Sequence, residues 1–300
     1  MDGSEIFPDQ TYTVEENAVT PAFNGTPTRT GYSFDGWTPS VADKVTWNVT
    51  YTAKWKANEY TVSYQRNGGE GQSYSPVQYC KYDQETTLRS SCPWTKTGYT
   101  FIGWNTRSDG TGAHYHAGQR VKNLTDRNNA NVLLYAQWQK NKYTVIYTDG
   151  VDGSEIFPDQ KTEKLLSGDK TPAFQGTPTR TGYTFDGWNP EVTDTVTTNA
   201  TYTAKWKVNI YTVTLNANGG TIASGKDVTS YTYGDGATLP TANDITREGY
   251  TFDGWYADNS FSGTPVTEIS NTDIGNKEFY AKWMRNTTPI TPGDTVKYIV

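Results

Sequence analysis

The chain has 300 residues and a formal net charge of −6, and it contains no basic run, so we expect no nucleic-acid partner. No apolar stretch approaches the length of a membrane-spanning helix, so we expect no membrane insertion in this segment. Hydrophobic residues make up only 34% of the chain but aromatic residues 14%, which favours several small cores built from large rings. Thr, Gly and Asn are abundant whereas Leu, Ala and Met are sparse, so the composition indicates a mostly β protein.

One motif, Gly-Tyr-x-Phe-x-Gly-Trp, recurs along the whole chain. Its alternation of aromatic and polar positions is typical of a β-strand. The second Gly, directly before Trp, predicts a bulge or a close approach of another backbone. Because self-similarity at a regular spacing indicates a repeat architecture, we interpret the chain as an array of four repeats. The copies of the motif occupy residues 31–37, 98–104, 182–188 and 249–255.

A second aromatic strand closes each repeat, and a Tyr-Thr-Val strand then opens the next one after a very short linker. Linkers of this length predict semi-rigid stacking of neighbouring repeats. The expected divisions are repeat 1 at 1–58, repeat 2 at 59–141, repeat 3 at 142–209, repeat 4 at 210–286, and a Thr/Pro linker with the start of a further module at 287–300. The rings expected to form the cores are Tyr32, Phe34, Trp37, Trp55, Tyr99, Phe101, Trp104, Trp138, Tyr183, Phe185, Trp188, Trp206, Tyr250, Phe252, Trp255 and Trp283.

The four repeats alternate between a short and a long form. The crossover from the motif to the closing strand is short in repeats 1 and 3 and longer in repeats 2 and 4. Only the long repeats contain Asn-Gly-Gly, at Asn67 and at Asn218, which predicts a tight hairpin turn. The segment 2–10 recurs verbatim at 152–160, so a short and a long repeat together form a duplicated unit.

The first repeat is incomplete compared with the third. Repeat 3 opens with Tyr143-Thr144-Val145-Ile146-Tyr147, and repeat 1 has only Met1 before the corresponding Asp2-Gly3. One interpretation is that the chain is cut from a longer array. Another is that the tail strand 295–300 completes the first repeat of a neighbouring molecule by strand addition.

The Tyr-Thr-Val opener, Asn-Gly-Gly, Thr-Arg-x-Gly-Tyr-Thr-Phe-x-Gly-Trp and Tyr-Ala-x-Trp together resemble the Listeria–Bacteroides repeat of the internalin B-repeat type, over residues 2–283. Val296-Lys297-Tyr298 resembles the start of a mucin-binding-protein-like repeat more weakly. The resemblance implies a β-grasp-like, and therefore α+β, fold. It also implies an extracellular place on a bacterial cell surface or cell wall, and a role as a stalk or adhesion module. A single helical turn would fit in the crossover near 41–43 or 267–269. The family offers no catalytic residues to carry over.

Catalysis has little support in the residues themselves. The only histidines, His114 and His116, lie two apart and could face one side of a strand to hold a metal. No Cys or carboxylate stands at ligand spacing beside them, and no other repeat has them, so a solvated loop is the better interpretation. A hydrolytic triad needs a histidine base beside the nucleophile, and three repeats contain no histidine. We expect a non-enzymatic protein without metal or cofactor.

Cys80 and Cys92 are the only cysteines, and both lie in repeat 2. An even count in an extracellular small domain favours a disulfide that clamps the second strand to the loop before the motif. Two independent buried thiols are the alternative.

A basic residue recurs two positions before each motif Gly. It is Arg29, Lys96, Arg180 or Arg247. A ligand-binding cation is one interpretation. Recurrence in every repeat favours the other, a cation–π contact with a core ring.

Aromatic residues without a counterpart in the other repeats are the candidates for ligand contact. Exposed rings of this kind stack on sugars or anchor proteins. The candidates are Trp47, Trp94, Tyr115 and Tyr256.

We therefore expect four small tandem repeat domains in an elongated, monomeric rod that is part of a bacterial surface protein. The leading functional prediction is a stalk that holds an adhesive or enzymatic head away from the cell envelope. The alternative is an adhesion module that binds host or mucin glycans or proteins through the long repeats. No signal peptide or anchor is visible in this segment.

Overall fold

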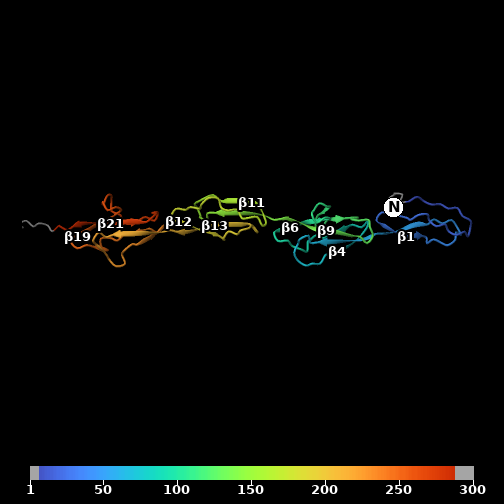
Figure 1. Ribbon diagram of the computed structural model, residues 1–300, viewed down its shortest axis with the longest axis horizontal. Coiled ribbons are helices and arrows are strands. Elements are labelled where there is room, and N and C mark those ends of the chain that lie inside the picture. Colours follow the sequence, from blue (N-terminus) through green and yellow to red (C-terminus); the bar gives the residue numbers. More distant parts are fainter. Residues whose placement is uncertain (1–6, 288–300) are drawn as a thin grey trace, which may run out of the picture. The chain divides into compact units, whose positions relative to one another are not determined.

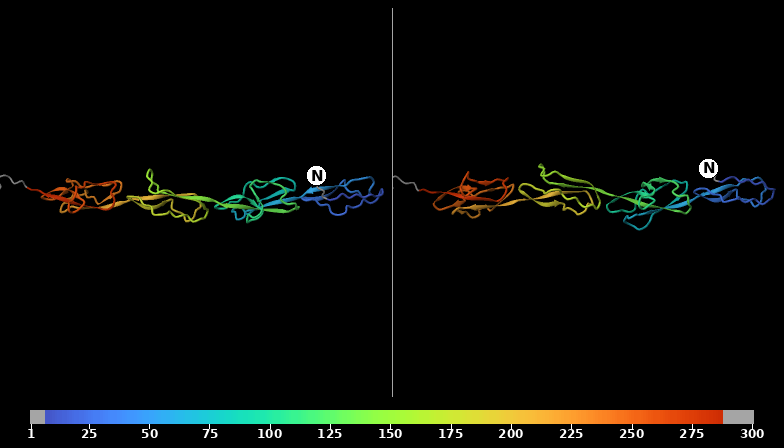
Figure 2. Two further views of the ribbon diagram at one scale, coloured as in Figure 1. Left: turned by 90° about the horizontal axis from the view of Figure 1, so that it is seen from above. Right: turned by 45° about the horizontal axis from the view of Figure 1, so that its top comes forward.

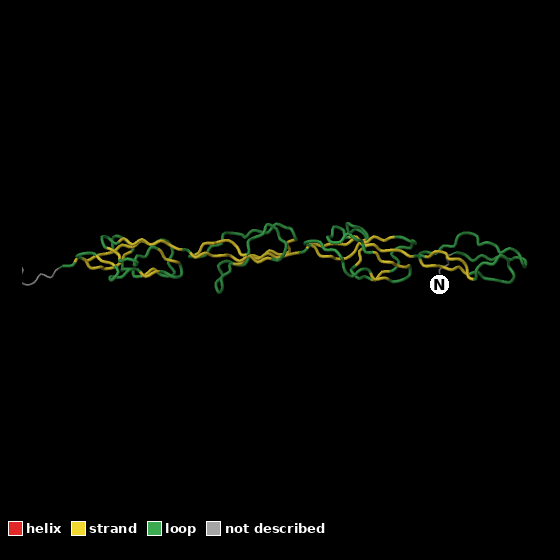
Figure 3. Tube along the Cα trace, turned by 90° about the horizontal axis from the view of Figure 1, so that it is seen from below, coloured by secondary structure: helices red, strands yellow, loops and turns green. Residues whose placement is uncertain are grey.

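The computed structural model describes residues 7–287, and within them all regular structure is β-strand, labelled β1 to β21. The trace coloured by secondary structure shows strands and loops alone (Figure 3). The mostly β prediction is confirmed. The helical part of the expected α+β class is not, since residues 7–287 contain no helix. The crossover of repeat 4 instead forms β20 (Glu268–Ile269), which pairs with β17 (Ala237–Thr238).

The chain divides into two compact units, each of which contains one short and one long repeat. The first comprises residues 1–142 together with 166–168, and the second comprises 143–165 together with 169–300. Each unit is described by itself below.

The long repeat of the first unit, repeat 2, is built on a five-stranded sheet in the order β4-β3-β9-β6-β7. The central β9 runs parallel to β3 and antiparallel to β6 (Figure 1). A separate pair of short strands, β5 and β8, covers the core. The bounds are β3 Glu59–Gln65, β4 Val77–Lys81, β5 Thr86–Thr87, β6 Tyr99–Asn105, β7 His114–Tyr115, β8 Arg120–Val121 and β9 Asn131–Lys140.

The short repeat of the first unit, repeat 1, has a two-stranded sheet in its described part. β1 (Tyr32–Thr38) pairs antiparallel with β2 (Thr52–Ala57). Its rings contact one another, as Phe34 does with Trp37 and Trp55 at centroid distances of 5.3 and 5.8 Å. None of the hydrophobic side chains from residue 7 to residue 57 is fully buried.

The second unit repeats this plan with two four-stranded sheets. Repeat 3 has the order β11-β10-β13-β12 and repeat 4 the order β16-β14-β21-β19, and the closing strand is again central in each. Their strands are β10 Lys142–Thr148, β11 Gln160–Leu166, β12 Tyr183–Asn189, β13 Ala200–Val208, β14 Ile210–Asn216, β15 Thr221–Ile222, β16 Ser230–Thr232, β17, β18 Ile245–Thr246, β19 Tyr250–Tyr256, β20 and β21 Lys277–Arg285.

The motif strand contains the predicted bulge in every repeat. Its pairing with the closing strand shifts register just after Phe34, Phe101, Phe185 and Phe252. The second Gly of the motif lies at this irregularity with positive φ, for example +93° at Gly36. Gly has no Cβ, so it tolerates this conformation and lets the strand re-aim the following Trp toward the core.

The motif Phe and Trp and the closing Trp pack in the cores of both long repeats, as predicted. The prediction was wrong for the motif Tyr residues, which lie outside these cores, and for Phe34, which is 36% exposed. In repeat 3, only Trp188 of the predicted rings packs against the buried cluster.

Trp104 and Trp255 are fully buried, and their indole N–H groups donate to the carbonyl oxygens of Arg89 and Pro240. Large rings need such partners for their polar atoms. Because the closing strand is central and carries the last ring of the core, it holds the opening and motif strands of a repeat together.

The Asn-Gly-Gly segments do not form the tight hairpin that the sequence predicts. Asn67 takes φ +47° and its side chain donates to the carbonyl of Ala136 on the closing strand. A Cβ at Gly69 would contact the ring of Trp138 at 2.8 Å. The turn is therefore shaped by the closing Trp that it covers, and β4 begins only after a further loop.

Candidate functional site: the inter-repeat junctions

The residues singled out for catalysis or metal binding do not assemble into a site. His114 and His116 have exposed side chains whose ring centroids lie 5.1 Å apart. Among residues 7–287, no group of three or more His, Cys, Asp or Glu side chains stands close enough to hold a metal ion. The same part of the chain contains no helix long and apolar enough to cross a bilayer.

Two of the four candidate aromatics prove to be core residues. Trp94 is 4% exposed, packs edge-on against Trp104 and donates its N–H to the carbonyl of Gln72. Tyr256 is also 4% exposed, and its hydroxyl donates to Asp253. The prediction of exposed rings was wrong at both, because the longer loops of repeats 2 and 4 fold over them. Tyr115 is half-buried against the core of repeat 2.

Trp47 is the one candidate that lies fully in solvent, with 72% of its surface exposed. Tyr79, which sequence reasoning missed, is 85% exposed on the edge strand β4. The signal was available, because Tyr79 alternates with the core-facing Cys80, so the two must point to opposite faces of the strand.

Cys80 and Cys92 are free thiols in the structure, so the expected disulfide is not formed. Cys80 is buried in the core of repeat 2, and Cys92 packs against the same core. Burial raises the pKa of both thiols. The structure therefore agrees with the alternative of two separate thiols that act as small apolar side chains.

The recurring cation lies over the motif Tyr in every repeat, which confirms the cation–π interpretation. The charged groups of Arg29, Lys96, Arg180 and Arg247 lie 3.9, 4.5, 3.8 and 4.1 Å from the ring centroids of Tyr32, Tyr99, Tyr183 and Tyr250.

One further residue recurs in every repeat, an Asn three positions after the closing Trp. Its N–H donates to the carbonyl of the motif's first Gly at 2.9 Å, and its side-chain oxygen accepts a hydroxyl from the motif strand at 2.6–2.7 Å. These two bonds fix the point where the chain leaves the repeat. The residues are Asn58, Asn141, Asn209 and Asn286, and their hydroxyl partners are Ser33, Thr100, Thr184 and Thr251.

The backbone carbonyl of the same Asn accepts a hydrogen bond from the following repeat. The carbonyl of Asn58 accepts the N–H of Tyr82, which follows β4 in repeat 2. The carbonyl of Asn209 accepts the N–H of Tyr233 in the same way within the second unit. In the first unit the carbonyl of Asn141 accepts the N–H of Ser167. Sequence analysis did not identify this residue, although its fixed spacing from the closing Trp is a readable signal.

At two junctions the arriving Tyr lies flat over the motif Gly. A Cβ at Gly31 would overlap the ring of Tyr82, and one at Gly182 would overlap the ring of Tyr233. The arriving ring also meets the motif Tyr edge-on, with centroid distances of 5.8 Å for Tyr32 and 5.7 Å for Tyr183. Arg, motif Tyr and arriving Tyr thus form a stack across each boundary.

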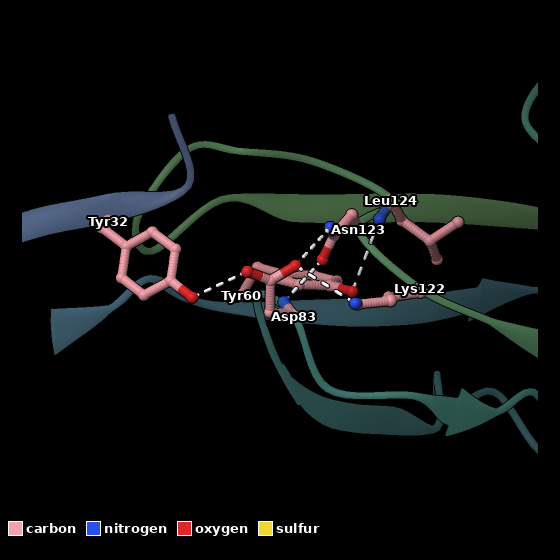
Figure 4. Close-up of polar contacts among 6 residues, drawn as sticks. All are labelled: Tyr32, Tyr60, Asp83, Lys122, Asn123 and Leu124. Carbon is pink, nitrogen blue, oxygen red and sulfur yellow. Dashed lines mark hydrogen bonds and ion pairs between the residues drawn. The ribbon is translucent and has the colours of Figure 1, made fainter. Parts of the chain in front are cut away.

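The junction of repeats 1 and 2 carries an additional polar network centred on Asp83 (Figure 4). Its carboxylate accepts the hydroxyl of Tyr32 at 2.7 Å and the amide of Asn123 at 3.0 Å, and it lies 3.3 Å from the ammonium of Lys122. The Asn123 hydrogen bond, followed by that of Tyr32, lowers the pKa of Asp83 to about 2. The same contact with Asp83 raises the pKa of Tyr32.

The side chain of Asn58 extends this network by donating to the carbonyl of Asp126 at 2.7 Å. Tyr32 therefore contacts the turn after β4 of repeat 2, and Asn58 contacts the crossover loop of the same repeat. These contacts fix the orientation of one repeat on the next within the unit.

The strand order, aromatic cores and junctions define a tandem array of small β repeats. The model of the Listeria-Bacteroides repeat domain matches residues 1–58, 60–137, 143–210 and 211–282, so the chain belongs to this family.

Several curated proteins are similar to the chain. One from Evansella cellulosilytica, whose name describes a Gly-rich membrane protein, is 29% identical over 295 residues, which covers 90% of this chain and 32% of that protein. A second protein of this organism, named as a membrane protein, is 26% identical over 88% of this chain and 40% of its own length. Internalin H of Listeria monocytogenes is 29% identical over 126 residues, 38% of this chain and 20% of that protein. The matched regions thus cover between 20% and 40% of these proteins.

Proposed function

We propose that this chain is a non-catalytic spacer in a bacterial cell-surface protein, an extended stalk that carries another part of the protein away from the envelope. The proposal rests on the contacts between consecutive repeats at the junction inside each unit. Consecutive repeats of a unit share backbone hydrogen bonds and stacked rings, which a flexible string of domains does not need.

The relatives support the location in the envelope. Two are named as membrane proteins and a third as an internalin, and each is much longer than this chain. A repeat region of 300 residues within such proteins has the length that a spacer requires.

Small-angle X-ray scattering of the whole chain tests the proposal. A compact protein of this length has a radius of gyration of about 19 Å. The spacer predicts a value at least twofold larger that does not depend on protein concentration. A value close to that of a compact protein would contradict it.

The exposed rings of Trp47 and Tyr79 favour a second function, adhesion to host or mucin glycans or proteins. Both rings can stack on a sugar face. Binding to a glycan and mucin panel, compared between the chain and its Trp47→Ala, Tyr79→Ser double variant, tests this function. Ser230 occupies the place of Tyr79 in repeat 4, so the second substitution copies a residue that the fold accepts. Saturable binding that the variant loses supports adhesion, and no binding by the chain contradicts it.

A further inference from the structure

The opening and closing strands of three repeats pair in parallel. Repeat 2 pairs Thr61–Gln65 with Asn131–Tyr135, and repeat 3 pairs Val145–Thr148 with Ala200–Thr203. Repeat 4 pairs Val213–Asn216 with Lys277–Tyr280. The two strands of each pair can be followed side by side by their colours in Figures 1 and 2.

This pairing determines how tension along the chain acts on a repeat. The opening strand is where the chain enters the repeat, and the closing strand is where it leaves. Because the strands are parallel, entry and exit lie at opposite ends of the pair. Tension therefore slides one strand along the other and loads all the hydrogen bonds between them together. An antiparallel hairpin pulled at its two ends would instead open one bond at a time.

The closing strand is also held on its other edge. In repeat 4, Tyr280–Arg285 pairs antiparallel with the motif strand β19. The exit strand is thus central, and pulling it out requires two ladders to break.

The parallel ladder of repeat 4 is shielded by apolar side chains of the same strands. Val213 and Phe279 are buried in the core, and Ala281 beside them is fully buried. Hydrogen bonds away from water are stronger, because no water molecule is at hand to replace a partner that separates.

We propose that the parallel pair of opening and closing strands is a mechanical clamp and that repeats 2, 3 and 4 are load-bearing elements. The proposal rests on the spacer function for its biological purpose. The clamp is a property of each repeat, whereas the spacer function concerns the length of the whole chain. A force measurement on one repeat therefore tests the clamp, and X-ray scattering of the chain separately tests the spacer.

Pulling repeat 4 in two directions within the whole chain tests the clamp without changing its ladder. Pulling handles are attached to cysteines that replace two residues at a time. Cysteines at positions 210 and 285 load the ladder between β14 and β21 in shear. Cysteines at positions 210 and 274 pull the same two strands apart from one end of the ladder. Ile210, Ile274 and Arg285 have exposed side chains. The native Cys80 and Cys92 are changed to Ala, a substitution confined to repeat 2. We expect the shear geometry to need an unfolding force about threefold higher or more, since forced unfolding follows the barrier that the load must cross. Equal forces in the two geometries would overturn the proposal.

A matched pair of substitutions locates the resistance. Thr214 has an exposed side chain and pairs with Glu278 in the parallel ladder. The N–H of its neighbour Val213 donates to Thr229 on the opposite side, so the N–H of Thr214 points toward β21. Thr214→Pro removes that donor and Thr214→Ala keeps it. We expect the shear force to fall about twofold in the Pro variant and to stay unchanged in the Ala variant. An unchanged force in a folded Pro variant would contradict the clamp.

Discussion

The ring of Tyr82 lies directly over Gly31, so close that a Cβ at Gly31 would overlap it. Gly31 directly precedes the motif strand β1 of repeat 1, and Tyr82 directly follows β4, the second strand of repeat 2. The pairing recurs in the second unit between Gly182 and Tyr233. The first Gly of the motif therefore has two roles. Its positive φ allows the turn before the motif strand, and its lack of a Cβ leaves room for the Tyr ring of the next repeat.

Gly31→Ala should destabilise the first unit more than the same substitution in repeat 4. Gly249 has nearly the same φ, +74° against +75°, but no described atom within 4 Å of an added Cβ. Gly249→Ala therefore measures the conformational cost alone, and Gly31→Ala adds overlap with Tyr82. We expect the difference in free energy of unfolding, measured with urea, to be about 1–3 kcal/mol. Equal effects would show that the ring over Gly31 is not held in place.

The junction of repeats 1 and 2 should weaken in acid. The pKa of Asp83 in the folded chain is about 2, below its ordinary value near 4. A lowered pKa means that the ionised form is favoured by folding, so its contribution is complete above about pH 4 and is lost as the pH falls toward about 2. We expect the hydrogen-exchange protection factors of the backbone amides of Asn58 and Tyr82 to fall over this window. Tyr32→Phe is the control, since it removes one of the bonds to Asp83 and should shrink the effect.

Substitution of the aromatic candidates by Ala should lower the free energy of unfolding strongly at the core positions and hardly at all at the surface position. Trp94→Ala and Tyr256→Ala should each cost about 3–5 kcal/mol, because they empty buried ring sites. Trp47→Ala should change stability by no more than about 0.5 kcal/mol, since its ring lies in solvent. Urea unfolding of the three variants checks this ranking, and a large loss for Trp47→Ala would show an unseen contact.

Repeat 1 should gain stability from the opening strand of repeat 3. Residues 2–10 equal 152–160, so Tyr143–Val151 placed before Asp2 reproduces the connection found in repeat 3. There, Tyr147 packs on Trp188 at 4.7 Å and β13 extends back to Ala200, whereas β2 begins only at Thr52. We expect slower hydrogen exchange over residues 49–52. The same insert with Asp at the positions of Val145 and Tyr147 should give no protection. The tail segment 295–300, considered above as a strand donor, lies outside the described residues.

The repeat organisation can be predicted from the sequence, but the contacts at the junctions between repeats cannot. Four motif copies and their closing Trp residues predict the core Phe and Trp rings of the long repeats, the bulge and the cation over each motif Tyr, because these depend on contacts within one strand pair. The motif Tyr residues were expected in the core, but those of the short repeats lie at the junctions. Trp94, Tyr256 and Cys80 were misjudged because their surroundings depend on how the long loops fold. Tyr82 and Asp83 gave no signal, since their role arises only when Tyr32 of another repeat is placed beside them.

The central claim is that the junction inside each unit holds the two repeats of that unit in one arrangement. Pulsed electron resonance between spin labels at Val41 in repeat 1 and Leu133 in repeat 2 tests it, because both side chains are exposed and lie in the same unit. Cys80 and Cys92 are changed to Ala for the labelling. We predict a single narrow distance distribution that broadens in Asn58→Ala, which lacks the side-chain bonds to Ser33 and Asp126. A distribution that is equally broad with and without Asn58 would contradict the account.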